Sequence, residues 1–292
     1  MLNTNRDRLV KLSVIGEISS PPAAQPPYRV SASGKPVVLP GVGGISYNVR
    51  IGDPAVGWEA DHMEPGVSIK NLEKKEGTRG ANDGLNTFAC IGNEAVVTSG
   101  EAKGERGTVT GKHGGIEHVL VDFAPEVKEK MVIGDKIQVK AYGVGLKLLD
   151  VDGVQVMNIA PDLLEKIPIQ IVEGVVVFPV THRIPATIMG SGLGAVDCHR
   201  GDYDIQLFDK EIVREYGLDD LRLGDFVAVM DAEHAYGRIY KKGAVTVGVV
   251  VHSDCVTAGH GPGVTTMLTS GAGKIRPEVV AKANLVTYLG IG

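Results

Sequence analysis

Glycine is the residue that most constrains how this chain folds. The 292-residue sequence has 39 glycines, close to twice the roughly 7% usage of an average protein. They recur between short runs of β-branched residues instead of gathering in a linker. This pattern is typical of many tight turns that connect many strands. We therefore expect a mainly β protein.

Ten segments have the composition of strands. They are residues 10–15, 46–51, 94–98, 107–111, 119–123, 136–141, 175–179, 203–207, 226–230 and 244–252. The last segment is apolar on both faces, which predicts a strand in the middle of a sheet, covered on both sides. The proline-rich stretch 18–40 is expected to be an extended arm.

Helices are predicted to be few and short. Residues 126–131 and 161–166 allow one or two turns each, and 209–216 begins at a capping Asp209 and stops at Gly217. The strongest helical pattern covers 277–289, because Pro277 suits a first helical position and apolar residues then repeat at a spacing of three. We expect a C-terminal helix there.

A faint internal duplication divides the chain. A histidine–glycine turn, a strand, a short helix, a Gly-Asp pair and a second strand occur from His113 to 139 and again from His199 to 229. This predicts two related β-sandwich or barrel-like modules, residues 1–160 with the extended arm and residues 161–292 ending in the helix. The two histidine turns should then meet at one site.

Charge and cysteine content exclude some classes of partner. The net charge is −5, the pI is about 5.9 and the basic residues are dispersed, so we expect neither nucleic acid nor membrane as a partner. No apolar run approaches the roughly 20 residues that cross a bilayer. The three cysteines lack CxxC spacing, which fits a reduced, cytoplasmic location.

Histidines near acids and glycines carry the chemical signal. Half of the eight histidines lie between residues 197 and 260, namely His199, His234, His252 and His260. Imidazoles and carboxylates at strand ends and glycine turns build metal sites and acid–base pairs. Asp202 and Asp204, two apart on a strand, should project to the same side.

These patterns give a specific site hypothesis. The predicted ligands of a divalent Zn²⁺, Mn²⁺ or Mg²⁺ ion are His199, Asp202, Asp231 and His234. Glu233 is the predicted general base, and His113 the predicted catalytic partner from the first module. The competing interpretation is that these segments are polar turns whose acids cap local amides.

The motifs at 61–66, 196–204 and 251–266 together resemble an uncharacterised prokaryotic family, domain of unknown function 4438. The resemblance covers nearly the whole chain. It implies a β-rich fold of two or more subdomains and no established activity.

A second resemblance is to acetamidase/formamidase enzymes, which hold metal on a mostly β scaffold. Residues 113–115 match their His-Gly-Gly turn, and residues 231–234 approximate their Gly-Asp-x-His turn. In this chain Met230 replaces the glycine, and Asp231 and His234 are one residue further apart. The resemblance implies metal-assisted hydrolysis of a small amide.

Two functions follow from the sequence. The first is a metal-dependent hydrolase of a small polar amide or related carbonyl compound. The alternative is a non-catalytic small-ligand-binding or oligomer-forming protein, a homo-oligomer whose glycine-rich loops pack subunits together and place His260 at an interface. Convergence of His199, His234 and His113 favours the enzyme, and their dispersal favours the alternative.

Overall fold

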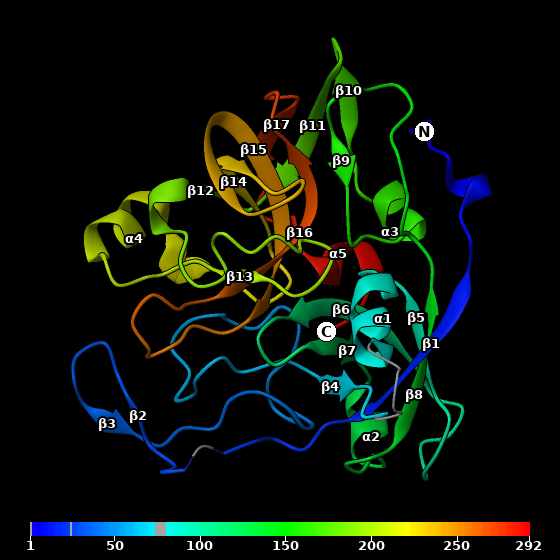
Figure 1. Ribbon diagram of the computed structural model, residues 1–292, viewed down its shortest axis with the longest axis vertical. Coiled ribbons are helices and arrows are strands. Elements are labelled where there is room, and N and C mark those ends of the chain that lie inside the picture. The colour runs from blue at the N-terminus through cyan, green and yellow to red at the C-terminus, as the bar shows by residue number, and fades with distance from the viewer. Residues whose placement is uncertain (1, 24, 74–79) are drawn as a thin grey trace.

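A computed structural model describes residues 2–23, 25–73 and 80–292 of the chain (Figure 1). Its first module is a closed six-stranded barrel in the order β1-β4-β7-β6-β5-β8. The barrel strands are β1 (Leu12–Ile18), β4 (Val67–Lys70), β5 (Glu94–Val97), β6 (Arg106–His113), β7 (His118–Asp122) and β8 (Lys136–Ala141). Their inward side chains, such as Val109, Val121 and Val139, form a separate apolar core.

The other elements of the N-terminal part of the chain are short. They are η1 (Arg6–Arg8), the two-stranded pair β2 (Arg29–Val30) and β3 (Pro36–Val37), α1 (Ala81–Phe88), α2 (Pro125–Lys128) and α3 (Pro161–Lys166). In the described residues of the 18–40 stretch, most positions outside that pair have no regular secondary structure. Within the described residues, no helix combines the length and apolarity needed to cross a membrane.

The second module is built of two open sheets. The larger has the order β12-β14-β15-β16-β13, with β9 (Gln155–Val156) pairing β16. Its other strands are β12 (His182–Pro185), β13 (Tyr203–Asp204), β14 (Phe226–Glu233), β15 (Ile239–His252) and β16 (Gly263–Ser270). The smaller sheet contains β10 (Gln170–Val172), β11 (Val175–Val180) and β17 (Ile275–Val279), and the helical elements are η2 (Ala186–Ile188), α4 (Lys210–Tyr216), η3 (Leu218–Asp220) and α5 (Leu285–Leu289).

The long strand β15 confirms the prediction of a central, doubly covered strand. It pairs with β14 on one side and β16 on the other, and residues 244–252 are all buried. The mainly β fold with few short helices is also confirmed. Asp209 caps α4 as predicted, because its side chain accepts the amide hydrogens of Glu211 and Ile212.

Two predicted elements are wrong. Residues 46–51 form turns instead of a strand, although Val49 and Ile51 are buried. The C-terminal helix is only α5. Residues 277–279 belong to β17, where Pro277 lies opposite Phe178 of the parallel strand β11, and the helix starts after Asn284 caps it. The spacing of three therefore marks neither a continuous helix nor a buried face, because Ala283 is buried while Val286 is exposed.

The two Gly-Asp pairs of the apparent duplication have the same local structure. Asp135 accepts a hydrogen bond from the amide of Val132, and Asp225 accepts one from the amide of Arg222. Each turn leads directly into a strand, β8 or β14. The two modules therefore have the same structure at these turns, although the barrel of the first module and the open sheets of the second differ in overall architecture.

Strand β6 joins the barrel to the larger sheet (Figure 1). The amide of Lys112 donates to Thr265 Oγ1 at 3.3 Å, and that hydroxyl donates to the Lys112 carbonyl at 2.9 Å. A Cβ on Gly111 would lie 2.3 Å from the Val251 side chain, so only glycine permits this approach. The ends of β6, β15 and β16 consequently lie together.

Candidate functional site

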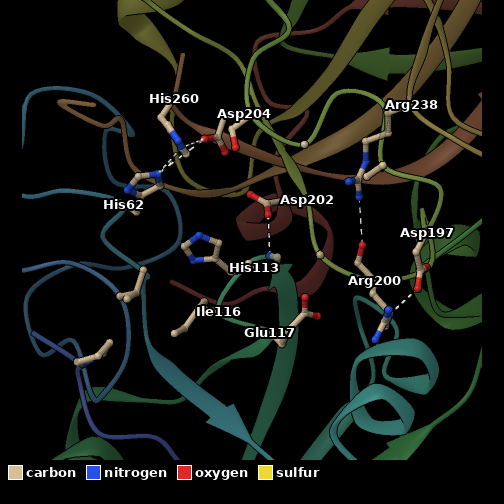
Figure 2. A pocket seen from close by; sticks show the side chains of 18 of the residues that line it. His62, His113, Ile116, Glu117, Asp197, Arg200, Asp202, Asp204, Arg238 and His260 are labelled. Carbon is tan, nitrogen blue, oxygen red and sulfur yellow. Dashed lines mark hydrogen bonds and ion pairs between the residues drawn. The ribbon is translucent and has the colours of Figure 1, made fainter. Parts of the chain in front are cut away.

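A cavity of about 540 Å³ opens where the two modules meet. Figure 2 shows His62, His113 and His260 with Asp202 and Asp204 on one side of it, and Arg200 and Arg238 with Asp197 on the other. Its walls come from the turn after β6, the segment 191–204, and the loops that carry His62 and His260. The volume is in the range of small-molecule sites.

Three buried side chains converge at this cavity, which we call the cavity centre: His113, Asp202 and His252. One potential ligand atom from each lies within 4.8 Å of the others. His113 ends β6, His252 ends β15, and Asp202 precedes β13. The strand ends of both modules thus supply one set of donors.

His252 and Asp202 form a buried ion pair whose geometry is not that of a hydrogen bond. His252 Nε2 lies 2.8 Å from Asp202 Oδ2, yet neither buried atom has a hydrogen-bond partner. Since His252 Nδ1 donates to the Ser253 carbonyl at 2.8 Å, a neutral ring would aim its Nε2 lone pair at a carboxylate. Two such electron-rich atoms require a cation between or beside them, either a proton or a metal ion.

Without a metal ion, a proton on His252 is that cation. Burial opposes the charged form of His252, but the charge of Asp202 outweighs it and raises the pKa of His252 to about 10. Burial likewise opposes ionisation of Asp202, and the charge of His252 keeps the pKa of that carboxyl below its ordinary value. A bound metal ion would have to displace this proton.

Both histidines of the cavity centre have their rings held in one orientation. His113 Nδ1 lies 2.5 Å from Glu64 Oε1, which leaves Nε2 for a ligand, while the Ser253 carbonyl holds His252 in the same way. Metal-ligating histidines almost always donate their second nitrogen to a carboxylate or a carbonyl. The two rings therefore have the outer partners that a metal site needs.

Glu64 is itself fixed from several directions. Its carboxylate accepts hydrogen bonds from Ser68 Oγ at 2.5 Å and from the Gly43 amide at 2.6 Å, and His118 Nδ1 lies 3.0 Å away. Burial would raise the pKa of Glu64, but the interaction with His113 and the other partners holds it well below its ordinary value. Glu64 is therefore an anion that orients His113.

Glycines allow the backbone to come close to Asp202. Its Oδ1 accepts a hydrogen bond from the Gly114 amide at 2.8 Å. A Cβ on Gly201 would lie 2.7 Å from the Gly114 Cα, and a Cβ on Gly263 would lie 1.9 Å from Asp202 Oδ2. The predicted meeting of the His113 turn with the second module's turn is thus confirmed at Gly114 and Gly201.

A second group lies beside the cavity centre. Asp204 Oδ1 is 3.5 Å from His252 Nε2, and its Oδ2 is 2.8 Å from His260 Nδ1. His62 Nε2 lies 3.1 Å from the same nitrogen of His260. Asp202 and Asp204 therefore face the same side, as their spacing predicted.

His62 is the most strongly shifted imidazole of the second group. Burial disfavours its charge, but Asp204 and Asp61 outweigh burial and raise the pKa of His62 to about 12. Its backbone has a φ of 59°, a conformation uncommon outside glycine. His62, His260 and Cys255 also form a set whose potential ligand atoms lie within 4.8 Å.

The buried Lys112 holds the Asp202 segment in place. Its ammonium donates to Asn158 Oδ1 at 2.7 Å and to the His199 carbonyl at 2.8 Å, and burial lowers its pKa to about 8. Asn158 in turn donates to the Cys198 carbonyl at 2.9 Å. Lys112 and Asn158 therefore fix residues 198–199 against β6, next to Asp202.

Of the residues predicted from the sequence, the structure brings together His113 and Asp202 only. His199 lines a different cavity together with Glu233, whose carboxylate lies 2.7 Å from Lys241 Nζ. The side chain of Asp231 accepts a hydrogen bond from the Gly243 amide at 2.7 Å. This is the role that the competing interpretation predicted, in which acids of polar turns cap local amides.

His234 also lies apart from the cavity centre. It is fully buried, with Nδ1 3.0 Å from Thr266 Oγ1 and its ring edge-on to Tyr203. Within the described residues, neither set of potential metal ligands contains His199, Asp231 or His234. His199, His234 and His113 are therefore dispersed, the outcome that was expected to favour the non-catalytic alternative. His113 converges instead with Asp202 and His252.

The sequence contained signals for the missing members. His252 ends the most confident strand, and the Asp61-His62 pair lies two residues from Glu64. The face that His252 takes could not be read from alternation, because a bulge shifts the β15–β16 register between Val250 and His252.

The fold and the cavity define a class: two-module β proteins with a buried histidine–carboxylate centre between the modules. The chain belongs to the family described as Domain of unknown function (DUF4438), whose N-terminal part matches residues 28–165 and whose C-terminal part matches residues 166–289.

A solved crystal structure described as that of TM1086 is 51% identical in sequence, with a TM-score of 0.92 over 98% of this chain and 99% of that one. No curated protein matches the chain. The likeness to acetamidase/formamidase enzymes therefore stays a prediction from the sequence.

Proposed function

We propose that the protein is a metal-dependent hydrolase of a small polar amide or related carbonyl compound. The observation that carries the proposal is the convergence of His113, Asp202 and His252, in which the buried atoms His252 Nε2 and Asp202 Oδ2 lie 2.8 Å apart and no other group satisfies them by a hydrogen bond. Buried polar atoms without a partner are rare and call for an explanation. A divalent cation shared by these side chains supplies one.

The donor set favours a catalytic type of metal site. Two imidazole nitrogens and one carboxylate oxygen suit Zn²⁺ or Mn²⁺ better than Mg²⁺, which prefers oxygen. Three protein ligands leave a position open for water or substrate. When bound, such an ion would polarise a carbonyl and lower the pKa of a water molecule.

We propose Asp204 as the acceptor of a proton from the attacking water, because it is the carboxylate on the cavity wall next to the proposed ligands. Burial opposes its charge, but His252 and His62 keep the pKa of this carboxyl well below its ordinary value, so it is an anion. It lies beside His252 on the cavity wall, and His260 Nδ1 at 2.8 Å orients its other oxygen. Asp204 thus replaces Glu233 as the proposed general base, because Glu233 pairs with Lys241 outside this cavity. His260 then has a role inside the site.

The test is ammonia release from a panel of small amides by protein purified without a histidine tag and loaded with Zn²⁺ or Mn²⁺. We expect turnover that a chelator abolishes. We also expect Asp204→Asn to lower kcat by about 10²- to 10⁴-fold, the usual contribution of a general base, with bound metal unchanged. Equal turnover by stripped protein, or an unaltered kcat for Asp204→Asn, would contradict the proposal.

A further inference from the structure

Three arginines line the cavity, and they differ in their partners. Arg29 Nη1 lies 2.7 Å from Asp61, and Arg200 pairs with Asp197 at 2.5 Å and with Asp83. Arg238 forms no ion pair with any acidic side chain in the described part of the chain. Of the three arginines that line the cavity, Arg238 is therefore the one whose positive charge has no acidic partner among the described residues.

Arg238 is also the most deeply placed of these cations. Its exposed fraction is 4%, and its Nε atom is buried with no hydrogen-bond partner. An unpaired buried charge is costly in a folded protein. Burial lowers the pKa of His234 to about 3, and the positive charge of Arg238 contributes to this shift.

The guanidinium is held in a fixed position. Arg238 Nη2 donates to the Arg200 carbonyl at 3.1 Å, and the guanidinium carbon lies 5.8 Å from the centre of the Tyr203 ring. The backbone amide of Arg238 donates to the Ala195 carbonyl at 3.0 Å. Figure 2 shows Arg238 on the opposite side of the cavity from His62 and His260.

From these observations we infer that the substrate carries a carboxylate group, which Arg238 binds while the other end of the molecule reaches the cavity centre. A guanidinium matches a carboxylate with two parallel hydrogen bonds. A doubly charged phosphate fits less well, because Asp197, Asp202 and Asp204 line the same cavity and only one positive charge lacks a partner. The inference names the substrate class of the proposed hydrolase. It rests on that proposed function, which determines which end of the substrate reacts.

The experiment measures binding of acetate, succinate, inorganic phosphate and neutral acetamide by calorimetry, on stripped and on Zn²⁺-loaded protein. We expect a carboxylate to bind at least about tenfold more tightly than acetamide, and Arg238→Met to remove that preference. Arg183→Met is the matched control, because Arg183 contacts the Pro277 carbonyl outside the cavity. Arg238→Lys keeps the charge and should retain part of the affinity.

The side-chain Nε–H signal of Arg238 in a ¹H–¹⁵N spectrum gives a second readout on wild-type protein. It should shift on addition of acetate and stay in place on addition of acetamide. Unchanged carboxylate affinity in a folded Arg238→Met variant, an unmoved Nε–H signal, or binding of phosphate in preference to carboxylates would overturn the inference. Stripped protein that binds carboxylate through Arg238 but takes up no metal would contradict the proposed hydrolase and leave the carboxylate site standing.

Discussion

Two regions of this molecule have the same residue types, but their potential ligand atoms converge in one region and not in the other. The cavity centre consists of His113, Asp202 and His252. The hairpin cluster consists of Asp231, Glu233 and His234, at the end of β14. In the hairpin cluster Asp231 and Glu233 have local partners, and His234 Nε2 is a single buried atom without a hydrogen bond. In the cavity centre two such buried atoms, His252 Nε2 and Asp202 Oδ2, lie 2.8 Å apart.

The difference shows that the density of acids and histidines does not locate a site. Asp231 has a φ of 56° and lies at a bulge between Met230 and Ala232, so its carboxylate is engaged by the turn that it helps to form. A functional set is distinguished by donors that converge, are buried and remain unsatisfied by the protein.

The largest expected effect separates the two regions directly. Asp202→Asn should abolish stoichiometric Zn²⁺ binding, because the change removes the only carboxylate of the cavity-centre set. Asp231→Asn, in the hairpin cluster, should leave the metal content unchanged. The measurement is metal analysis of tag-free protein after dialysis. Equal metal loss in the two variants would erase the distinction between the regions.

A smaller effect is expected from the residue behind His113. Glu64→Gln keeps the size of the side chain but removes the charge that orients the His113 ring. Loss of such an outer partner typically weakens metal binding by 10- to 100-fold. Competition with a fluorescent chelator measures this change, and Glu233→Gln is the control. Unchanged affinity in Glu64→Gln would show that His113 does not bind metal through Nε2.

The smallest effect concerns the pH dependence of the hairpin cluster. Burial lowers the pKa of His234 to about 3 from an ordinary value of 6.5. The unfolded chain therefore binds a proton below pH 6.5 that the folded chain excludes, and stability falls as pH drops from 6.5 towards 3. Between pH 7 and pH 5 this amounts to about 2 kcal/mol.

Urea unfolding of metal-free wild type and His234→Gln at both pH values checks this expectation. The wild type should lose about 2 kcal/mol more than the variant over that interval. An equal loss in both proteins would mean that His234 accepts a proton in the folded state and is available for chemistry after all.

Much of the fold was predictable because local physics decides it. Strand β15 could be predicted because its residues are apolar on both faces, and the start of α4 could be predicted from the capping Asp209. Neither prediction needed information about the tertiary structure. The prediction of a helix over 277–289 was wrong because the parallel pairing with β11 holds Pro277 in a strand, and this pairing cannot be inferred from the spacing of apolar residues.

The site was predictable only in part. His113 and Asp202 lie in glycine turns, which can be recognised from residues that are close in sequence, and both belong to the cavity centre. His252 depended on a register shift in β15, and Glu64 reaches the site from a loop that precedes β4. Such placements arise from how the modules pack, which residue spacing along the chain does not specify.

Anomalous diffraction from crystals of Zn²⁺-loaded, tag-free protein tests the central claim most directly. The account predicts one strong peak within ligand distance of His113 Nε2, Asp202 Oδ2 and His252 Nε2. No peak there, with His252 and Asp202 joined as a simple ion pair, or a peak instead at His199 or His234, would contradict it.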